Sequence, residues 1–161
     1  MGCIPTTTTK PEAQTQTMVV KKPTELPSIM PDDFNIIYGS SPGMVPEATT
    51  IQISEKESFY QRQSNNVIIK IPYEVTKEEL QSLYKVFYTN GFDQIETYEE
   101  GTYDRGGVSI QIRIGNRNYF KVNGGMSYVK PEYLADYQKI VDTIVNLNSE
   151  KTKGKTPEYA M

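Results

Sequence analysis

Residues 75–92 read VTKEELQSLYKVFYTNGF, a stretch that carries the start, the apolar face and the end of an amphipathic helix. Thr76 is placed to act as its N-cap, and Glu79 three residues later completes a capping box. The apolar residues that follow recur at intervals of three and four and share one face; they are Leu80, Leu83, Tyr84 and Phe87. Asn90 and Gly91 supply the stop. The stretch therefore predicts a helix that packs against an apolar surface formed elsewhere in the chain.

The segments around this helix alternate in polarity with a period of two, which predicts strands. The clearest alternation runs from Val108 to Ile114, with valine or isoleucine at every second position. Gly115 and Asn116 turn this segment back into residues 119–122, so a hairpin is predicted. Weaker strand patterns occupy residues 34–38, 50–54, 58–62 and 67–71, and residues 94–103 are expected to hold an irregular edge strand.

A second helix is predicted from Pro131, because proline fits the first helical position and an apolar stripe follows it as far as Leu147. Together these elements predict an α+β domain: a largely antiparallel sheet of about five to six strands with two helices packed on one face. The other face of the sheet is expected to be polar, as Ser109, Gln111 and Arg113 indicate.

This domain is expected to span residues 32–148, between two segments that lack such patterns. Residues 1–31 are rich in Thr, Pro and Gln, a composition that predicts a disordered tether. Residues 149–161 are charged, carry no apolar stripe and are expected to form a disordered tail. The sequence thus predicts one domain with a flexible segment at each end.

The composition removes several classes of function from consideration. The chain contains no histidine, which is the usual acid or base at neutral pH and the commonest metal ligand. Its one cysteine, Cys3, leaves neither an intrachain disulfide nor a cysteine cluster for zinc. A net charge of -3 and a pI near 5.1 argue against binding to nucleic acid, which needs clustered Lys and Arg. No catalytic constellation is recognised, and no metal or cofactor is expected.

The start of the chain, Met1-Gly2-Cys3-Ile4-Pro5-Thr6, supports three interpretations. In the first, Gly2-Cys3 is the end of a bacterial lipobox whose apolar signal segment is not part of this sequence, and Cys3 carries the lipid. In the second, Gly2 and Thr6 match the N-myristoylation pattern and Cys3 is a palmitoylation site beside it. In the third, Cys3 is a free thiol on an exposed arm. The choice between them decides the compartment.

One acidic, glycine-containing loop is the densest cluster of functional residue types. Its members are Glu96, Tyr98, Glu99, Glu100, Tyr103, Asp104 and Arg105. Carboxylates on such a loop can hold calcium, although the spacing matches no EF-hand, and a carboxylate pair can also serve a hydrolase. The simpler interpretation is a solvated connection. Tyr98, Glu99, Glu100, Tyr103, Asp104 and Arg105 are therefore kept as a candidate loop for a partner or ligand.

The order of segments resembles domains of uncharacterised bacterial lipoproteins. The resemblance covers roughly residues 33–147 and depends on Asp33-Phe34-Asn35-Ile36-Ile37-Tyr38, Ile51-Gln52-Ile53, Val75-Thr76-Lys77-Glu78-Glu79-Leu80, Asn90-Gly91-Phe92 and Tyr103-Asp104. It implies an extracytoplasmic domain that a lipid on Cys3 holds at the membrane, and it implies no catalytic residues.

These observations lead to one expected function and two alternatives. The expectation is a non-enzymatic, lipid-anchored domain in the periplasm or at the cell surface, which binds a protein or another envelope component. The first alternative is an intracellular adaptor at the cytoplasmic face of a membrane, acylated at Gly2 and Cys3. The second is a calcium-dependent or hydrolytic module that uses the acidic loop.

Overall fold

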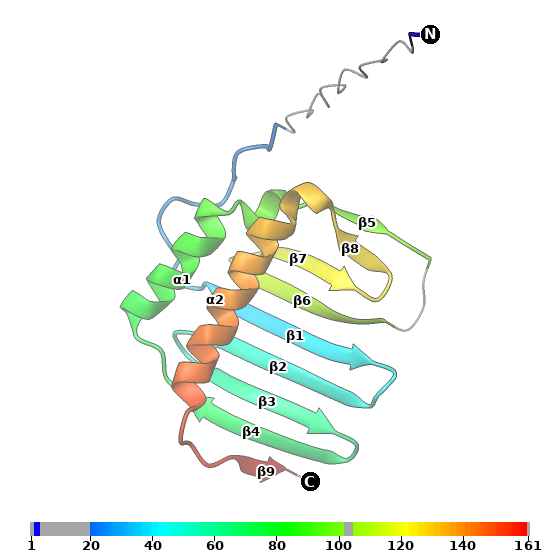
Figure 1. Cartoon of the computed structure of the whole chain (residues 1–161). Coiled ribbons are helices and arrows are strands. Elements are labelled where there is room, and N and C mark those ends of the chain that lie inside the picture. Colours follow the sequence, from blue (N-terminus) through cyan, green and yellow to red (C-terminus); the bar gives the residue numbers. More distant parts are fainter. Residues whose placement is uncertain (1, 4–19, 102–104, 161) are drawn as a thin grey trace.

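The computed structural model describes residues 2–3, 20–101 and 105–160, and it has an α+β architecture (Figure 1). Nine strands form one sheet: β1 Asn35–Gly43, β2 Glu47–Ser54, β3 Ser58–Ser64, β4 Val67–Tyr73, β5 Thr97–Glu99, β6 Arg105–Ile114, β7 Arg117–Gly124, β8 Ser127–Val129 and β9 Glu158–Ala160. Two helices, α1 Lys77–Thr89 and α2 Leu134–Thr152, lie in front of this sheet in Figure 1. Single 3-10 turns, η1 Phe92–Gln94 and η2 Pro131–Tyr133, follow α1 and precede α2.

The sheet consists of two meanders that meet at its centre. Its strand order is β5-β8-β7-β6-β1-β2-β3-β4-β9, and neighbouring strands pair antiparallel. The chain makes β1 to β4 in sequence, returns through α1, and adds β6 beside β1. The strands β1 and β6 therefore join residues about seventy positions apart in the sequence, and they pair from Asn35↔Arg113 to Gly43↔Arg105.

The α1 helix forms as its sequence predicts. The Thr76 hydroxyl accepts a hydrogen bond from the Glu79 backbone N–H at 3.1 Å, and the Glu79 carboxylate accepts one from the Thr76 N–H at 2.9 Å. At the other end, Gly91 takes a positive φ of 56°, which lets Phe92 fold back until its ring lies 5.1 Å from that of Phe87. Both ends are thus held by the residues that the pattern indicated.

The core lies between the helices and one face of the sheet. Alternate residues of the central strands are almost fully buried there, and they include Ile36, Ile53, Ile110 and Ile112. Residues of both helices complete the same cluster, including Leu83 and Phe87 of α1 and Tyr137, Ile140 and Ile144 of α2. The Tyr137 hydroxyl also donates to the Val108 carbonyl at 2.8 Å, which fixes α2 over β6.

The expected sheet of five to six strands was wrong, because the described residues form a sheet of nine. Three strands at the two margins of the sheet, β5, β8 and β9, are only three residues long; β5 lies within the edge strand expected at residues 94–103, whereas β8 and β9 were not predicted. Such short strands are stabilised by backbone hydrogen bonds to a neighbour and need no period-two pattern of their own. The segment between Gly125 and Pro131 carries no such pattern, although it contains β8.

Structure extends past the expected domain limits at both ends. Leu26 is only 4% exposed and belongs to the core, and the Tyr84 hydroxyl donates to the Pro27 carbonyl at 2.5 Å. At the other end, α2 continues to Thr152, and Glu158–Ala160 pair with β4 as β9. One leucine in a proline-rich segment and three residues of edge strand give no periodic signal, so the composition of these segments predicted disorder instead.

Candidate functional site

The structure divides the predicted acidic loop rather than gathering it into a site. Tyr98 and Glu99 belong to edge strand β5, where the Tyr98 ring lies 5.9 Å from that of Tyr128 on β8. Glu100 is exposed, and its backbone N–H donates to the Met126 carbonyl at 2.9 Å. Tyr103 and Asp104 lie outside the described residues. Arg105 begins β6, which β8 and β7 separate from β5 in the sheet.

Glu96, at the start of the same segment, takes part in an exposed ion pair. Its carboxylate accepts a hydrogen bond from the Lys130 ammonium group, and this contact lowers the pKa of Glu96 and raises that of Lys130. The backbone N–H of Lys130 also donates to the Glu96 carbonyl at 3.0 Å. These contacts join the residue before β5 to the residue between β8 and η2, so Glu96 has a structural role in this arrangement.

The candidate lipid-attachment residues are exposed. Both Gly2 and Cys3 are accessible to solvent, and residues 4–19 between them and the domain lie outside the described part of the chain. Within residues 20–101 and 105–160, neither helix is both long and apolar enough to span a bilayer.

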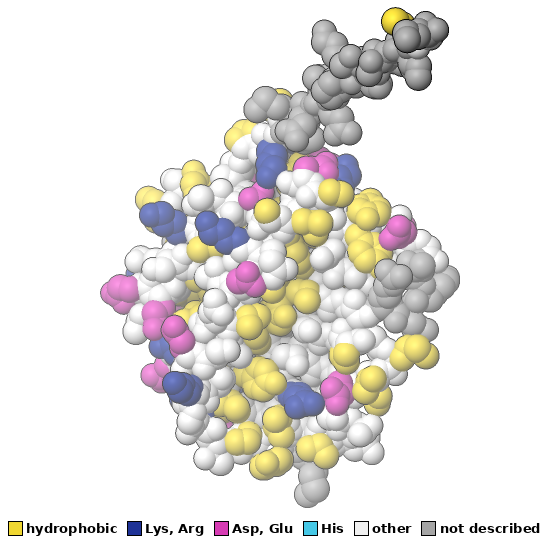
Figure 2. All heavy atoms as spheres, viewed as in Figure 1, with side chains coloured by type: hydrophobic (Ala, Val, Ile, Leu, Met, Phe, Trp, Pro, Cys, Tyr) yellow, Lys and Arg dark blue, Asp and Glu magenta, His cyan; other side chains and the backbone are white. Residues whose placement is uncertain are grey.

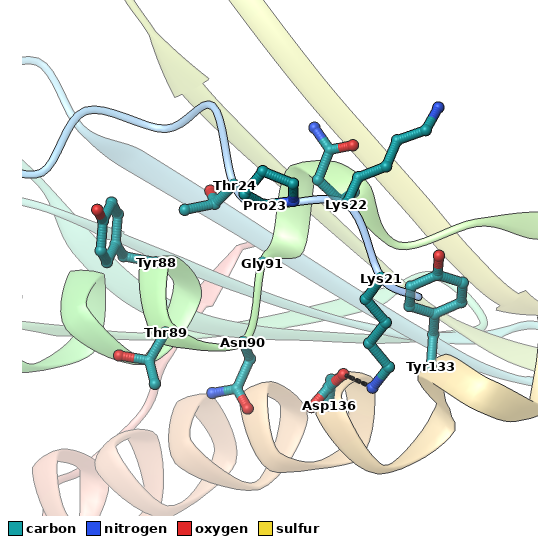
Figure 3. Close-up of a pocket in the computed structure, with 11 residues that line it drawn as sticks. Lys21, Lys22, Pro23, Thr24, Tyr88, Thr89, Asn90, Gly91, Tyr133 and Asp136 are labelled. Atoms are coloured by element: carbon teal, nitrogen blue, oxygen red, sulfur yellow. Dashed lines mark hydrogen bonds and ion pairs between the residues drawn. The ribbon is translucent and has the colours of Figure 1, made fainter. Parts of the chain in front are cut away.

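The segment that leads from the N-terminus into the domain forms one wall of a pocket of about 460 Å³ (Figure 3). The end of α1 and the start of α2 form the other walls. Lys21 crosses this pocket: its ammonium group contacts Asp136 at 2.6 Å and lies 5.6 Å from the centre of the Tyr133 ring. These contacts attach the N-terminal segment to α2, which explains the pocket as a junction between segments.

The helix side of the molecule carries mixed charge. Figure 2 shows Lys and Arg side chains interspersed with Asp and Glu over this side, rather than gathered in one patch. Arg62 and Glu47, for example, contact each other at 3.4 Å on neighbouring strands. This side therefore presents no single electrostatic signature for a ligand.

The other face of the sheet is different, because its side chains retain access to solvent and carry little charge. The strand register assigns to this face Asn118, Phe120 and Val122 of β7; Gly107, Ser109, Gln111 and Arg113 of β6; Asn35, Ile37, Gly39 and Ser41 of β1; Ala48, Thr50 and Gln52 of β2; and Phe59, Gln61 and Gln63 of β3. These residues are half-buried or exposed. The register continues the same face to Gly43 of β1, Arg105 of β6 and the buried Gly124 of β7. We call this surface the open face.

One row across the open face alternates apolar and amide side chains. Register places Phe120 opposite Gln111, Gln111 opposite Ile37, Ile37 opposite Gln52, and Gln52 opposite Phe59. With neighbouring strands about 4.8 Å apart, the four steps from Phe120 to Phe59 span roughly 19 Å. Phe120 is 58% exposed, whereas the Phe59 ring is partly covered by the Lys70 ammonium group at 4.1 Å. Phe120 is thus the accessible aromatic ring of this row.

Beside Phe120 the open face is hollowed by about 430 Å³. Its floor includes glycines with no room for a side chain: a Cβ on Gly124 would lie 2.4 Å from the Gly106 carbonyl oxygen, and one on Gly39 would lie 2.7 Å from the side-chain Oγ of Ser109. Gly124 also has a φ of 129°, which side chains rarely permit. The missing side chains leave a depression whose wall includes Phe120 and Val122.

The sequence predicted a polar open face but did not reveal its aromatic residue. Phe120 lies in the predicted hairpin, and the register set by the Gly115-Asn116 turn places it with Val122 on the open face while Tyr119 and Lys121 face the helices. That signal was present in residues 108–122. To conclude from it that Phe120 is exposed, one must also know that both helices pack on the face that carries Ile110 and Ile112.

The fold and the open face define a small α+β domain with a broad exposed sheet surface. No family model matches the chain, and no curated protein matches it either.

Proposed function

We propose that this chain is a non-enzymatic binding domain whose open face binds a protein or another component of the cell envelope, and that a lipid on Cys3 holds it at the membrane. The observation that carries the proposal is the exposed Phe120 ring on a wide sheet surface to which the register of β7, β6, β1, β2 and β3 assigns two charged residues, Arg105 and Arg113, one at each end of β6. Exposed aromatic rings on surfaces depleted of charge are typical of binding sites.

The position of the N-terminal segment supports the proposed anchoring. Residues 20–31 attach on the helix side, where Leu26 enters the core and Lys21 contacts α2. A tether that joins the domain there leaves the open face accessible. Cys3 is exposed, as lipid attachment requires.

The binding part of the proposal is tested by co-sedimentation with delipidated envelope material from the native cells. The wild-type chain is expected to sediment with this material, and Phe120→Asp, which places a charge on the open face, is expected to remain in solution. Tyr159→Asp is the matched control, because Tyr159 is 73% exposed but lies on the helix side of β9. Equal sedimentation of the wild type and Phe120→Asp, or no sedimentation of the wild type, would contradict the proposal.

The anchoring part is tested by the intact mass of the protein purified from its native membranes. A diacylglyceryl group on Cys3, with Met1 and Gly2 removed, is the expected result. Myristate on Gly2 would instead place the protein at the cytoplasmic face, and an unmodified Cys3 would refute a lipid anchor.

A further inference from the structure

We propose that the ligand of the open face is a neutral polysaccharide, an inference that depends on the binding role proposed above. The argument begins with charge. The chain as a whole is 23% charged, yet the row that runs from Phe120 to Phe59 contains no ionisable side chain between these two rings. An anionic polymer needs several cations along its path, whereas an uncharged polymer avoids the cost of removing water from ionic groups.

The polar groups of the row match the chemistry of sugar hydroxyls. Gln111 and Gln52 lie on either side of Ile37, and each amide offers two donor hydrogens and an acceptor oxygen. Sugar hydroxyl groups both donate and accept hydrogen bonds, so a glutamine amide can bind them either through its N–H groups or through its oxygen. Two amides separated by two strand spacings, about 10 Å, can contact different rings of one extended chain.

The hollow provides a place for a single ring. Phe120 and Val122 form an apolar wall, and the glycine floor lies at the level of the backbone. The hydroxyl-bearing residues Ser109 and Thr50 line the same hollow. A sugar ring presents C–H bonds on its flat faces and hydroxyls at its rim, so it can pack on Phe120 while its rim meets Ser109 and Thr50.

The continuity of the row with the hollow favours a polymer over a free monosaccharide. Phe120 belongs to both, so a ring held in the hollow is continuous with a path of roughly 19 Å towards Phe59. We therefore assign the path across β7, β6, β1, β2 and β3 to an extended, uncharged glycan chain.

The inference is tested by native gel electrophoresis of the full chain in gels that contain a soluble polysaccharide. The polymers are a β-glucan, an α-glucan, a galactomannan and the neutral polysaccharide extracted from the native envelope, with alginate as the anionic comparison. At least one neutral polymer is expected to retard the wild-type chain, and added salt is expected to leave the retardation unchanged, since no ion pairs are involved. Alginate is expected to cause no retardation.

Variants localise the effect. Phe120→Ala is expected to weaken the association roughly tenfold, and Gln111→Ala to weaken it severalfold. Tyr159→Ala, which removes an exposed ring on the helix side, is expected to bind as the wild type does. Retardation that Phe120→Ala leaves unchanged, or retardation by alginate alone, would overturn the inference.

Two outcomes separate this inference from the proposed function. If no neutral polymer retards the chain but delipidated envelope material still sediments it in a Phe120-dependent way, the ligand is another component of that material, such as a protein, and only the glycan assignment fails. If both experiments fail, the binding role of the open face fails as well.

Discussion

The two faces of the sheet differ in how far their large apolar side chains are exposed to solvent. On the helix side, α1 and α2 cover isoleucines of the central strands that are 0% exposed: Ile36, Ile53, Ile110 and Ile112. On the open face, Ile37 and Phe59 are half-buried and Phe120 is 58% exposed. The covered face therefore forms the core of the domain, whereas the open face leaves its side chains accessible to solvent. Each prediction below tests that division.

The largest expected effect comes from the covered face. Phe87 is fully buried and makes edge contacts with Phe34 at 5.8 Å and Phe92 at 5.1 Å between ring centres. Phe87→Ala is expected to lower the free energy of unfolding by about 3–5 kcal/mol, because it leaves a cavity. Phe120→Ala, the same change on the open face, is expected to alter it by about 0.5 kcal/mol or less. Urea unfolding of both variants measures the difference, and similar losses would show that the open face also contributes to the core.

Two glycines allow the effect of a steric clash on stability to be compared with the effect of backbone conformation alone. Both Gly124 and Gly91 have positive φ, but a Cβ on Gly124 would lie 2.4 Å from the Gly107 Cα, whereas one on Gly91 would meet nothing within 4 Å. Gly124→Ala is expected to cost about 1–3 kcal/mol and to weaken ligand binding in the hollow. Gly91→Ala is expected to cost about 1 kcal/mol through conformation alone. Thermal unfolding checks the order, and a Gly91→Ala variant that is the less stable of the two would contradict it.

The N-cap of α1 tests whether the stability of the covered face can be lowered without an effect on the open face, because α1 is one of the two helices that cover the sheet. Thr76→Ala removes the side-chain acceptor for the Glu79 N–H and is expected to destabilise the domain by about 1 kcal/mol. Binding through the open face is expected to be unaffected in conditions where the variant is folded. A loss of binding together with full folding would indicate that the two faces are coupled.

The smallest expected effect is a dependence of stability on pH through Glu79. Hydrogen bonds from Lys151 and from the Thr76 backbone lower the pKa of Glu79 below its ordinary value of 4.5. Because the pKa is lower in the folded state, this contribution is present above pH 4.5 and is lost as the pH falls through the folded-state pKa. Glu79→Gln should therefore be less stable than the wild type at neutral pH, and the gap should narrow below pH 4.5. A gap that does not change with pH would assign the effect of Glu79 to something other than its charge.

The sequence predicted the local elements better than their assembly. The limits of α1 follow from its cap and from Gly91, and the β6–β7 hairpin follows from alternation around Gly115 and Asn116, because these signals act between neighbours in the chain. The pairing of β1 with β6 brings together distant segments, and the short marginal strands β8 and β9 have no alternating pattern of their own, so the number of strands was underestimated.

For the candidate site as well, the sequence revealed residues that are close along the chain but not residues that only the folded sheet brings together. The acidic loop was conspicuous as a run of residues, but the sheet separates Arg105 from Glu99 by two intervening strands. The row from Phe120 to Phe59 draws one residue from each of five strands, and no local pattern connects them. Only the register of the assembled sheet places Gln111 and Gln52 on either side of Ile37.

The most direct test of the open face as a recognition surface is an NMR titration of the full, isotope-labelled chain with solubilised envelope material. We predict that changes in backbone amide chemical shift are concentrated in β7, β6, β1 and β2, around Phe120, Gln111 and Gln52, while α1 and α2 change little. Shifts confined to the helices, or no shifts at concentrations where the chain sediments with envelope material, would contradict the assignment of binding to the open face.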